Sequence, residues 1–170
     1  MTYNIHPLLV HFPIAFLLLY SLLRILPFDR WFPKVSWREI RFVVLLAGVL
    51  GAFFANTTGE VAEHIARPDH KIVETHAFFA LLSTWVYGLL CLGEVLFFTN
   101  SFLSKKIPSS AISVLSFVER ILTNKEITML LALSGVVAIS ITGMLGGVMV
   151  YGVSADPLAP FVLKLLGLSQ

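Results

Sequence analysis

Charged side chains are scarce in this sequence, and their scarcity limits the kinds of protein that it can encode. Aspartate, glutamate, lysine and arginine make up 13% of the 170 residues, whereas about 25% is usual in soluble domains. Hydrophobic residues contribute 57%, and the mean hydropathy is +0.87. Because so few charges cannot cover a hydrophobic core with a polar surface, we expect an integral membrane protein whose main partner is the lipid bilayer.

Cysteine is nearly absent, and the common catalytic motifs do not occur. The single cysteine, Cys91, excludes an internal disulfide and a cysteine-rich metal site. Without a phosphate-binding glycine loop, a nucleophile motif or a His-Glu-x-x-His pattern, we assign no catalytic residue and do not expect an enzyme acting on its own. There is no basic patch with interleaved aromatic residues either, so nucleic acid is not an expected partner.

Four long apolar segments are the main feature that the sequence does contain. A helix needs roughly 20 residues to cross about 30 Å of hydrocarbon, and residues 7–26, 40–58, 76–98 and 127–150 meet this requirement. Residues 1–170 are therefore predicted to form one all-α domain, a four-helix membrane bundle.

The first segment shows where its helix should begin. Pro7 suits the first helical turn, and Pro13 is expected to kink the helix. No basic residue precedes this segment and no small-residue cleavage site follows it, so we expect it to remain as a helix rather than to be removed as a signal peptide.

The basic residues indicate the orientation of the bundle. Only Arg67, Lys71 and Lys164 lie on the side that carries the termini. Because basic loops remain in the cytoplasm, we expect a multi-pass protein of the bacterial inner (cytoplasmic) membrane with both termini on the periplasmic side. The other nine of the twelve basic residues lie in the first and third connections: Arg24, Arg30, Lys34, Arg38, Arg41, Lys105, Lys106, Arg120 and Lys125.

Two shorter apolar segments complete the chain. In residues 109–122 the apolar side chains fall on one helical stripe, which predicts a short amphipathic helix on the cytoplasmic interface. Residues 158–168 are too few to span a bilayer, and we expect them to dock on the outer side.

All five histidines are predicted to lie on the same side of the membrane. His6 and His11 open the first span, His64 and His70 follow the second, and His76 opens the third. Neutral imidazole binds transition metals and haem iron, and ionisable groups within a membrane are commonly functional. We therefore expect a cofactor near the outer face.

Haem b is the first cofactor that this arrangement favours. His11 and His76 are the preferred axial ligands, because each lies within about two turns of its helix end. Packed together, their helices could present one imidazole to each face of a haem. His6, closer to the headgroup region, is an alternative ligand.

The end of the second span offers a different set of donors. Glu60 and His64 are four residues apart and share a helical face. They could bind a non-haem transition metal such as iron, manganese or zinc. A solvated helix end accounts for the same two residues without a metal, and both interpretations stay open here.

Small residues recur along the fourth span. Ser134, Ala138, Thr142 and Gly146 are spaced by four, and Gly143 with Gly147 forms a Gly-x-x-x-Gly pair. Close helix packing is one interpretation of this stripe. A flat surface against a macrocycle is the other, and the two are compatible.

The opening stretch His6–Pro13, HPLLVHFP, is the most specific in the chain. It closely resembles the start of the bacterial membrane family called domain of unknown function 2231. Thr58-Gly59, His76 and Thr142–Gly147 are similar to that family too. Many members carry histidine where this chain has Met144; methionine also ligates haem, so either Met144 is a further candidate ligand or a site has been lost here.

The resemblance covers all four spans and implies redox partners. Family members are sometimes fused to periplasmic cytochrome or iron–sulfur modules, so our first hypothesis is a small b-type cytochrome-like electron-transfer protein that works between quinone and periplasmic redox proteins. The second hypothesis is a non-haem metal-binding membrane protein. The third is a structural or assembly subunit without a cofactor, which joins an oligomer or a larger complex through its fourth helix.

Overall fold

The computed structural model describes residues 4–66, 68–106 and 108–168 of the chain, and every regular element in these ranges is a helix. Arg67, one of the basic residues expected on the side of the termini, lies outside them. The elements are α1 (His6–Ile25), α2 (Phe28–Trp31), α3 (Trp37–Ala66), α4 (His70–Leu103), α5 (Ser109–Leu122), α6 (Lys125–Tyr151), η1 (Val153–Ala155) and α7 (Ala159–Leu165).

Each of the four predicted spans corresponds to one long helix, which confirms the all-α four-helix bundle. Helices α1, α3, α4 and α6 are long and apolar enough to cross a membrane. Pro7 lies in the first turn of α1, and the helix continues through Pro13. Gly51 of α3 makes room for that proline, since a Cβ at position 51 would lie 3.2 Å from Pro13 Cδ.

Helices α3 and α4 are longer than predicted, at 30 and 34 residues. The predicted bounds followed hydropathy, but a helix ends where its backbone hydrogen bonds end. Residues 59–66 are rich in glutamate and alanine, which are good helix formers in a polar setting. Helix α4 begins six residues earlier than predicted because Asp69 caps it, accepting hydrogen bonds from the backbone N–H groups of Lys71 (3.0 Å) and Ile72 (3.2 Å).

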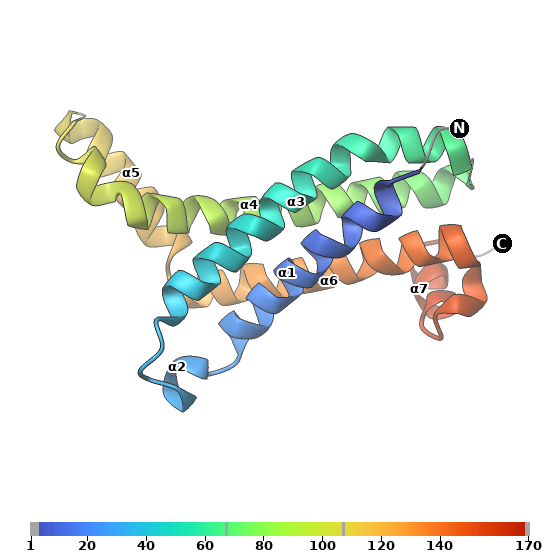
Figure 1. Cartoon of the computed structure of the whole chain (residues 1–170), viewed down its shortest axis with the longest axis horizontal. Coiled ribbons are helices and arrows are strands. Elements are labelled where there is room, and N and C mark those ends of the chain that lie inside the picture. The colour runs from blue at the N-terminus through green and yellow to red at the C-terminus, as the bar shows by residue number, and fades with distance from the viewer. Residues whose placement is uncertain (1–3, 67, 107, 169–170) are drawn as a thin grey trace.

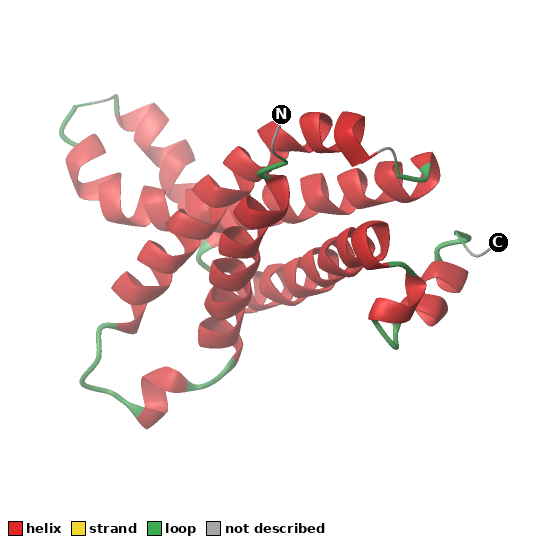
Figure 2. Cartoon of the chain, turned by 45° about the vertical axis from the view of Figure 1, so that its right-hand side comes forward, coloured by secondary structure: helices red, strands yellow, loops and turns green. Residues whose placement is uncertain are grey.

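The four long helices form two pairs that cross. Helix α1 packs along α3, and α4 packs along α6, while fewer contacts join α3 to α4 and α1 to α6. Figures 1 and 2 show α1 and α3 running obliquely across the other pair, with both chain termini at one end. We call this the histidine end; it comprises the starts of α1 and α4 and the ends of α3 and α6. The opposite end, with α2 and α5, is the basic end.

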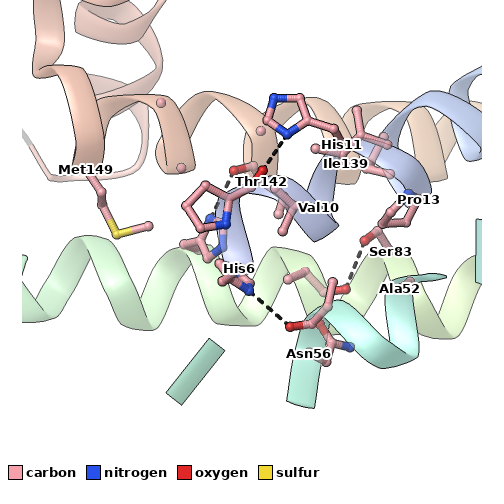
Figure 3. Close-up of a pocket in the computed structure, with 18 of the residues that line it drawn as sticks. His6, Val10, His11, Pro13, Ala52, Asn56, Ser83, Ile139, Thr142 and Met149 are labelled. Carbon is pink, nitrogen blue, oxygen red and sulfur yellow. Dashed lines mark hydrogen bonds between the residues drawn. The ribbon is translucent and has the colours of Figure 1, made fainter. Parts of the chain in front are cut away.

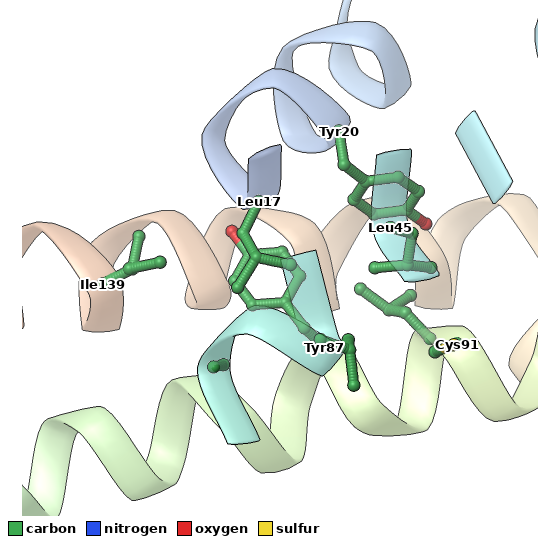
Figure 4. Close-up of a cluster of buried hydrophobic side chains, with 9 residues drawn as sticks. Leu17, Tyr20, Leu45, Tyr87, Cys91 and Ile139 are labelled. Carbon is green, nitrogen blue, oxygen red and sulfur yellow. The ribbon is translucent and has the colours of Figure 1, made fainter. Parts of the chain in front are cut away.

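The centre of the crossing is packed around Tyr87 of α4 (Figure 4). This side chain is fully buried, and its hydroxyl forms a hydrogen bond of 2.8 Å with the hydroxyl of Ser21 on α1. Its ring meets Tyr20 edge-on, with 6.3 Å between ring centroids. Gly135 lets α6 approach the ring, because a Cβ there would lie 2.7 Å from Tyr87 Cζ.

Ion pairs bind the helices together at the basic end. Arg38 pairs with Glu94 at 2.9 Å and stacks 3.1 Å from the ring centroid of Phe97. Arg41 is buried and pairs with Asp29 of α2 at 2.8 Å. The hydrogen bond from Arg41 holds the pKa of the Asp29 carboxyl below its ordinary value.

Helices α5 and α7 each turn apolar residues toward the long helices. Helix α5 has the predicted bounds and packs against α4, while Val114 and Phe117 on its outer side are each 63% exposed. Helix α7 docks against the end of α6, where Leu163 joins a buried cluster with Leu145 and Val148.

Large apolar side chains cover the outside of the bundle, as expected of a protein solvated by lipid. Nine that are more than 60% exposed lie on the long helices: Leu8, Val43, Phe53, Phe54, Phe78, Trp85, Leu130, Val150 and Tyr151.

Candidate functional site

Two adjoining cavities lie between the long helices at the histidine end. The inner cavity has a volume of about 260 Å³ and is lined by residues of α1, α3, α4 and α6, many of which are drawn in Figure 3. The outer cavity, of about 380 Å³, reaches toward the end of α3 and the start of α4. Both cavities are lined by His6, Asn56, His76 and Met149.

His6 is fixed against the end of α3. Its Nδ1 lies 2.9 Å from Thr58 Oγ1 and 3.1 Å from the carbonyl oxygen of Ala55. A carbonyl oxygen only accepts hydrogen bonds, so Nδ1 carries the proton and donates it. In a neutral imidazole, Nε2 is then left with a lone pair.

His76 is fixed in the same manner, by α6. Its Nδ1–H donates to the carbonyl oxygen of Thr142 at 2.9 Å, which again leaves Nε2 as an acceptor. Gly146, one turn after Thr142, lies against the ring, because a Cβ there would be 3.4 Å from His76 Cε1. The small-residue stripe of α6 therefore includes the position against which His76 packs.

His11 also has a fixed tautomer, but in more open surroundings. Its Nδ1–H donates to the carbonyl oxygen of Pro7 one turn earlier, and the side chain is exposed. Five residues separate His6 from His11, which places their side chains about 140° apart around α1. Figure 3 shows the two rings directed to different sides.

The structure therefore brings three predicted ligands to one cavity, since His6, His11 and His76 all line the inner one. His6 and His76 also share the outer cavity. Among the described residues, Nε2 of these three rings has no hydrogen-bond partner.

Met144 lies apart from this group. It packs against the buried cluster of Leu145, Val148 and Leu163 that α7 covers. Met149 lines both cavities instead, and sequence reasoning missed it. The helical spacing of Thr142, Gly146 and Met149 by four and three residues is the signal that could have identified it.

The predicted metal donors Glu60 and His64 are only partly brought to the cavities. Glu60 and Glu63 line the outer cavity, whereas His64 is exposed and does not line either cavity. Within residues 4–66, 68–106 and 108–168, no group of three or more histidine, cysteine, aspartate or glutamate side chains is arranged to hold a metal ion.

A polar pair from α3 and α4 borders the inner cavity. The side-chain amide of Asn56 donates to Thr84 Oγ1 at 3.1 Å, and Ser83 lines the same cavity. Sequence reasoning missed Asn56. A lone asparagine inside an apolar span is itself a signal, because burial in lipid requires a hydrogen-bond partner.

The cavities can thus accept a group that offers a Lewis-acidic metal or a hydrogen-bond donor to imidazole nitrogen. No curated protein and no solved structure matches the chain. The profile of one family, described as "Predicted membrane protein (DUF2231)", matches residues 2–156, which include all four spans and every histidine. The chain therefore belongs to this family of membrane proteins, domain of unknown function 2231.

Proposed function

We propose that the chain binds a b-type haem at the histidine end and serves as a small membrane cytochrome in electron transfer. The observation that carries this proposal is the matched pair of His6 and His76. Each ring donates its Nδ1–H to a carbonyl oxygen, and each has Nε2 available beside the same two cavities. Histidines that ligate metals almost always hold their other ring nitrogen in this way.

The residues present suit a haem. The porphyrin supplies four nitrogen ligands itself, so the protein need add only one or two imidazoles. The haem would occupy the outer cavity of about 380 Å³, which both imidazoles line. When bound, the haem iron would supply one-electron redox chemistry.

Residues of the chain would hold and orient this group. His6 and His76 would ligate through Nε2, while the carbonyls of Ala55 and Thr142 keep both rings in the required tautomer. His6 takes the place of His11 as the partner of His76, because His11 is exposed and lines only the inner cavity.

The same proposal places the site at the periplasmic face of a bacterial inner membrane. The support is the excess of lysine and arginine in the connections at the basic end, which the positive-inside rule assigns to the cytoplasm. The haem would then pass electrons between membrane quinone and a periplasmic redox protein.

Optical spectroscopy of the purified protein, produced with haem available, tests the proposal. We expect a Soret band and a dithionite-reduced minus oxidised difference spectrum typical of haem b. His6→Ala and His76→Ala should each abolish or shift it. His70→Ala is the matched control, since His70 lies at the same end, is exposed, lies 3.5 Å from Glu74 and lines neither cavity. A wild-type protein without a Soret band would refute the proposal.

A non-haem transition metal is the second candidate, and one observation favours it. Glu60 and Glu63 line the outer cavity together with His6 and His76, so carboxylate and imidazole donors share one space. Elemental analysis separates the two candidates: a stoichiometric metal without porphyrin supports this one, and iron with porphyrin supports haem.

A further inference from the structure

The proposed haem ligation leaves His11 without a role, although its surroundings are unusual. The side chain is exposed on an apolar span, between Leu8 and Phe12, which are 68% and 58% exposed. Its described hydrogen bond is the one to the Pro7 carbonyl within the same helix. An imidazole in such a position is costly in lipid unless a further group bonds to it.

The chemistry of the ring restricts what that group can be. Because Nδ1 donates to a carbonyl, Nε2 of the neutral ring can only accept. A quinone carbonyl or a lipid phosphate also accepts, and neither can bond to this nitrogen. A hydroxyl group donates and fits.

The space beside His11 is open on the α6 side. A Cβ at Gly147 would meet no atom within 4 Å, and one at Gly143 would meet only Ile14 Cδ1 at 3.9 Å. Val150 and Tyr151, which also line the inner cavity, are 61% and 77% exposed. The contacts between α1 and α6 are sparse. The inner cavity is therefore bordered by lipid-facing side chains of both helices, so that a molecule dissolved in the bilayer can enter between them.

We propose that the inner cavity between His11 and the Gly143–Gly147 segment binds the head of a lipid-soluble quinol, whose hydroxyl donates to Nε2 of His11. The flat ring lies along the side-chain-free face of α6, and the isoprenoid tail extends into the bilayer past Val150. This inference rests on the proposed function in one respect: the quinol, oxidised to the quinone, would give its two electrons one at a time to the haem and release its two protons to water at the histidine end. Binding of the quinol itself does not require haem.

The test is a binding titration on the full chain in nanodiscs of phosphatidylcholine, whose headgroup has no hydrogen-bond donor to compete for His11. The probe is 2-heptyl-4-hydroxyquinoline N-oxide, a fluorescent quinol analogue with a flat head, one hydroxyl and an apolar tail. We expect saturable quenching of its fluorescence by the wild type. His11→Ala should weaken binding roughly tenfold or more, and His70→Ala should leave it unchanged. His11→Gln retains an acceptor oxygen and should recover part of the affinity.

The double variant His6→Ala/His76→Ala separates this inference from the proposed function. It should lose the haem spectrum and still bind the probe in a manner that depends on His11. A wild-type chain that has no haem spectrum but binds the probe through His11 supports the quinol site and refutes the cytochrome. No saturable binding by the wild type, or equal affinity in the wild type and in a folded His11→Ala variant, overturns the quinol site.

Discussion

The imidazole of His76 on α4 is held by the backbone carbonyl of Thr142 on α6, with 2.9 Å between Nδ1 and the oxygen. The bond joins two helices at the edge of a cavity and fixes the ring tautomer in one contact. A Cβ at Gly146 would lie 3.4 Å from the ring, at ordinary van der Waals distance, so there is no room for a side chain that extends further toward it.

A larger residue at position 146 should therefore disturb His76. We predict that Gly146→Val displaces the ring, because the branched methyl groups extend beyond a Cβ that is already in van der Waals contact with it. Most of the haem absorbance should be lost, while the helix content measured by circular dichroism stays at the wild-type level. Gly88→Ala is the control, since a Cβ at that position meets no atom within 4 Å and Gly88 lines neither cavity. Equal loss of absorbance in both variants would contradict the assigned role of His76.

The close approach of Gly135 to Tyr87 predicts that a larger residue at position 135 destabilises the centre of the bundle. Gly135→Ala places a methyl group within 2.7 Å of the Tyr87 ring, so the ring must move and its bond to Ser21 is strained. We expect a loss of about 1–3 kcal/mol, as for other overpacked cores, seen as a lower unfolding temperature in detergent. Gly88→Ala has open space and should be neutral or slightly stabilising.

Removing the hydroxyl of Ser21 should lower the stability of the protein more than removing the hydroxyl of Tyr87. Ser21→Ala leaves the buried Tyr87 hydroxyl without its partner, at a cost of about 1–3 kcal/mol. Tyr87→Phe should cost less, because Ser21 can turn its hydroxyl to a carbonyl of its own helix. Thermal unfolding of the two single variants and of the double variant gives the coupling free energy between the two hydroxyl groups. A larger cost for Tyr87→Phe than for Ser21→Ala would be inconsistent with this account.

The ion pair of Asp29 and Arg41 predicts an acid-dependent contribution to stability. The Asp29 pKa is lowered in the folded state, chiefly by the hydrogen bond from Arg41. The stabilisation is therefore fully present above the ordinary carboxyl pKa of 3.8 and is lost as the pH falls through the lowered value. We expect Asp29→Asn to be less stable than the wild type at neutral pH, and the difference in unfolding temperature to disappear in strong acid. A difference that does not change with pH would show that the carboxylate charge is not its source.

The orientation can be tested with single cysteines. The native Cys91 is buried, so it gives little background with a membrane-impermeant maleimide. Lys71→Cys at the histidine end should react in intact cells whose outer membrane has been permeabilised. Lys34→Cys at the basic end should react only after the inner membrane is opened. The reverse pattern would place the histidine end on the cytoplasmic side of the membrane and would contradict the proposed periplasmic redox partner.

Much of the fold follows from local properties of the sequence. Hydropathy predicts the number and approximate positions of the spans, because solvation by lipid depends on the composition of each segment taken alone. The start of α1 beside Pro7 and the bounds of α5 are equally local, since they depend on proline geometry and on one amphipathic stripe. The ends of α3 and α4 were missed because helix formation continues into polar residues where hydropathy falls.

The sequence by itself determined that this is a four-helix membrane protein with its histidines gathered at one end. The tertiary structure decided which groups meet there: His6 with His76 beside both cavities, Met149 in place of Met144, and Asn56 paired with Thr84. The physical reason is that meeting depends on the rotation and crossing of whole helices. These are set by contacts far from the histidines, such as the approach of Gly135 to Tyr87, and no single segment encodes them.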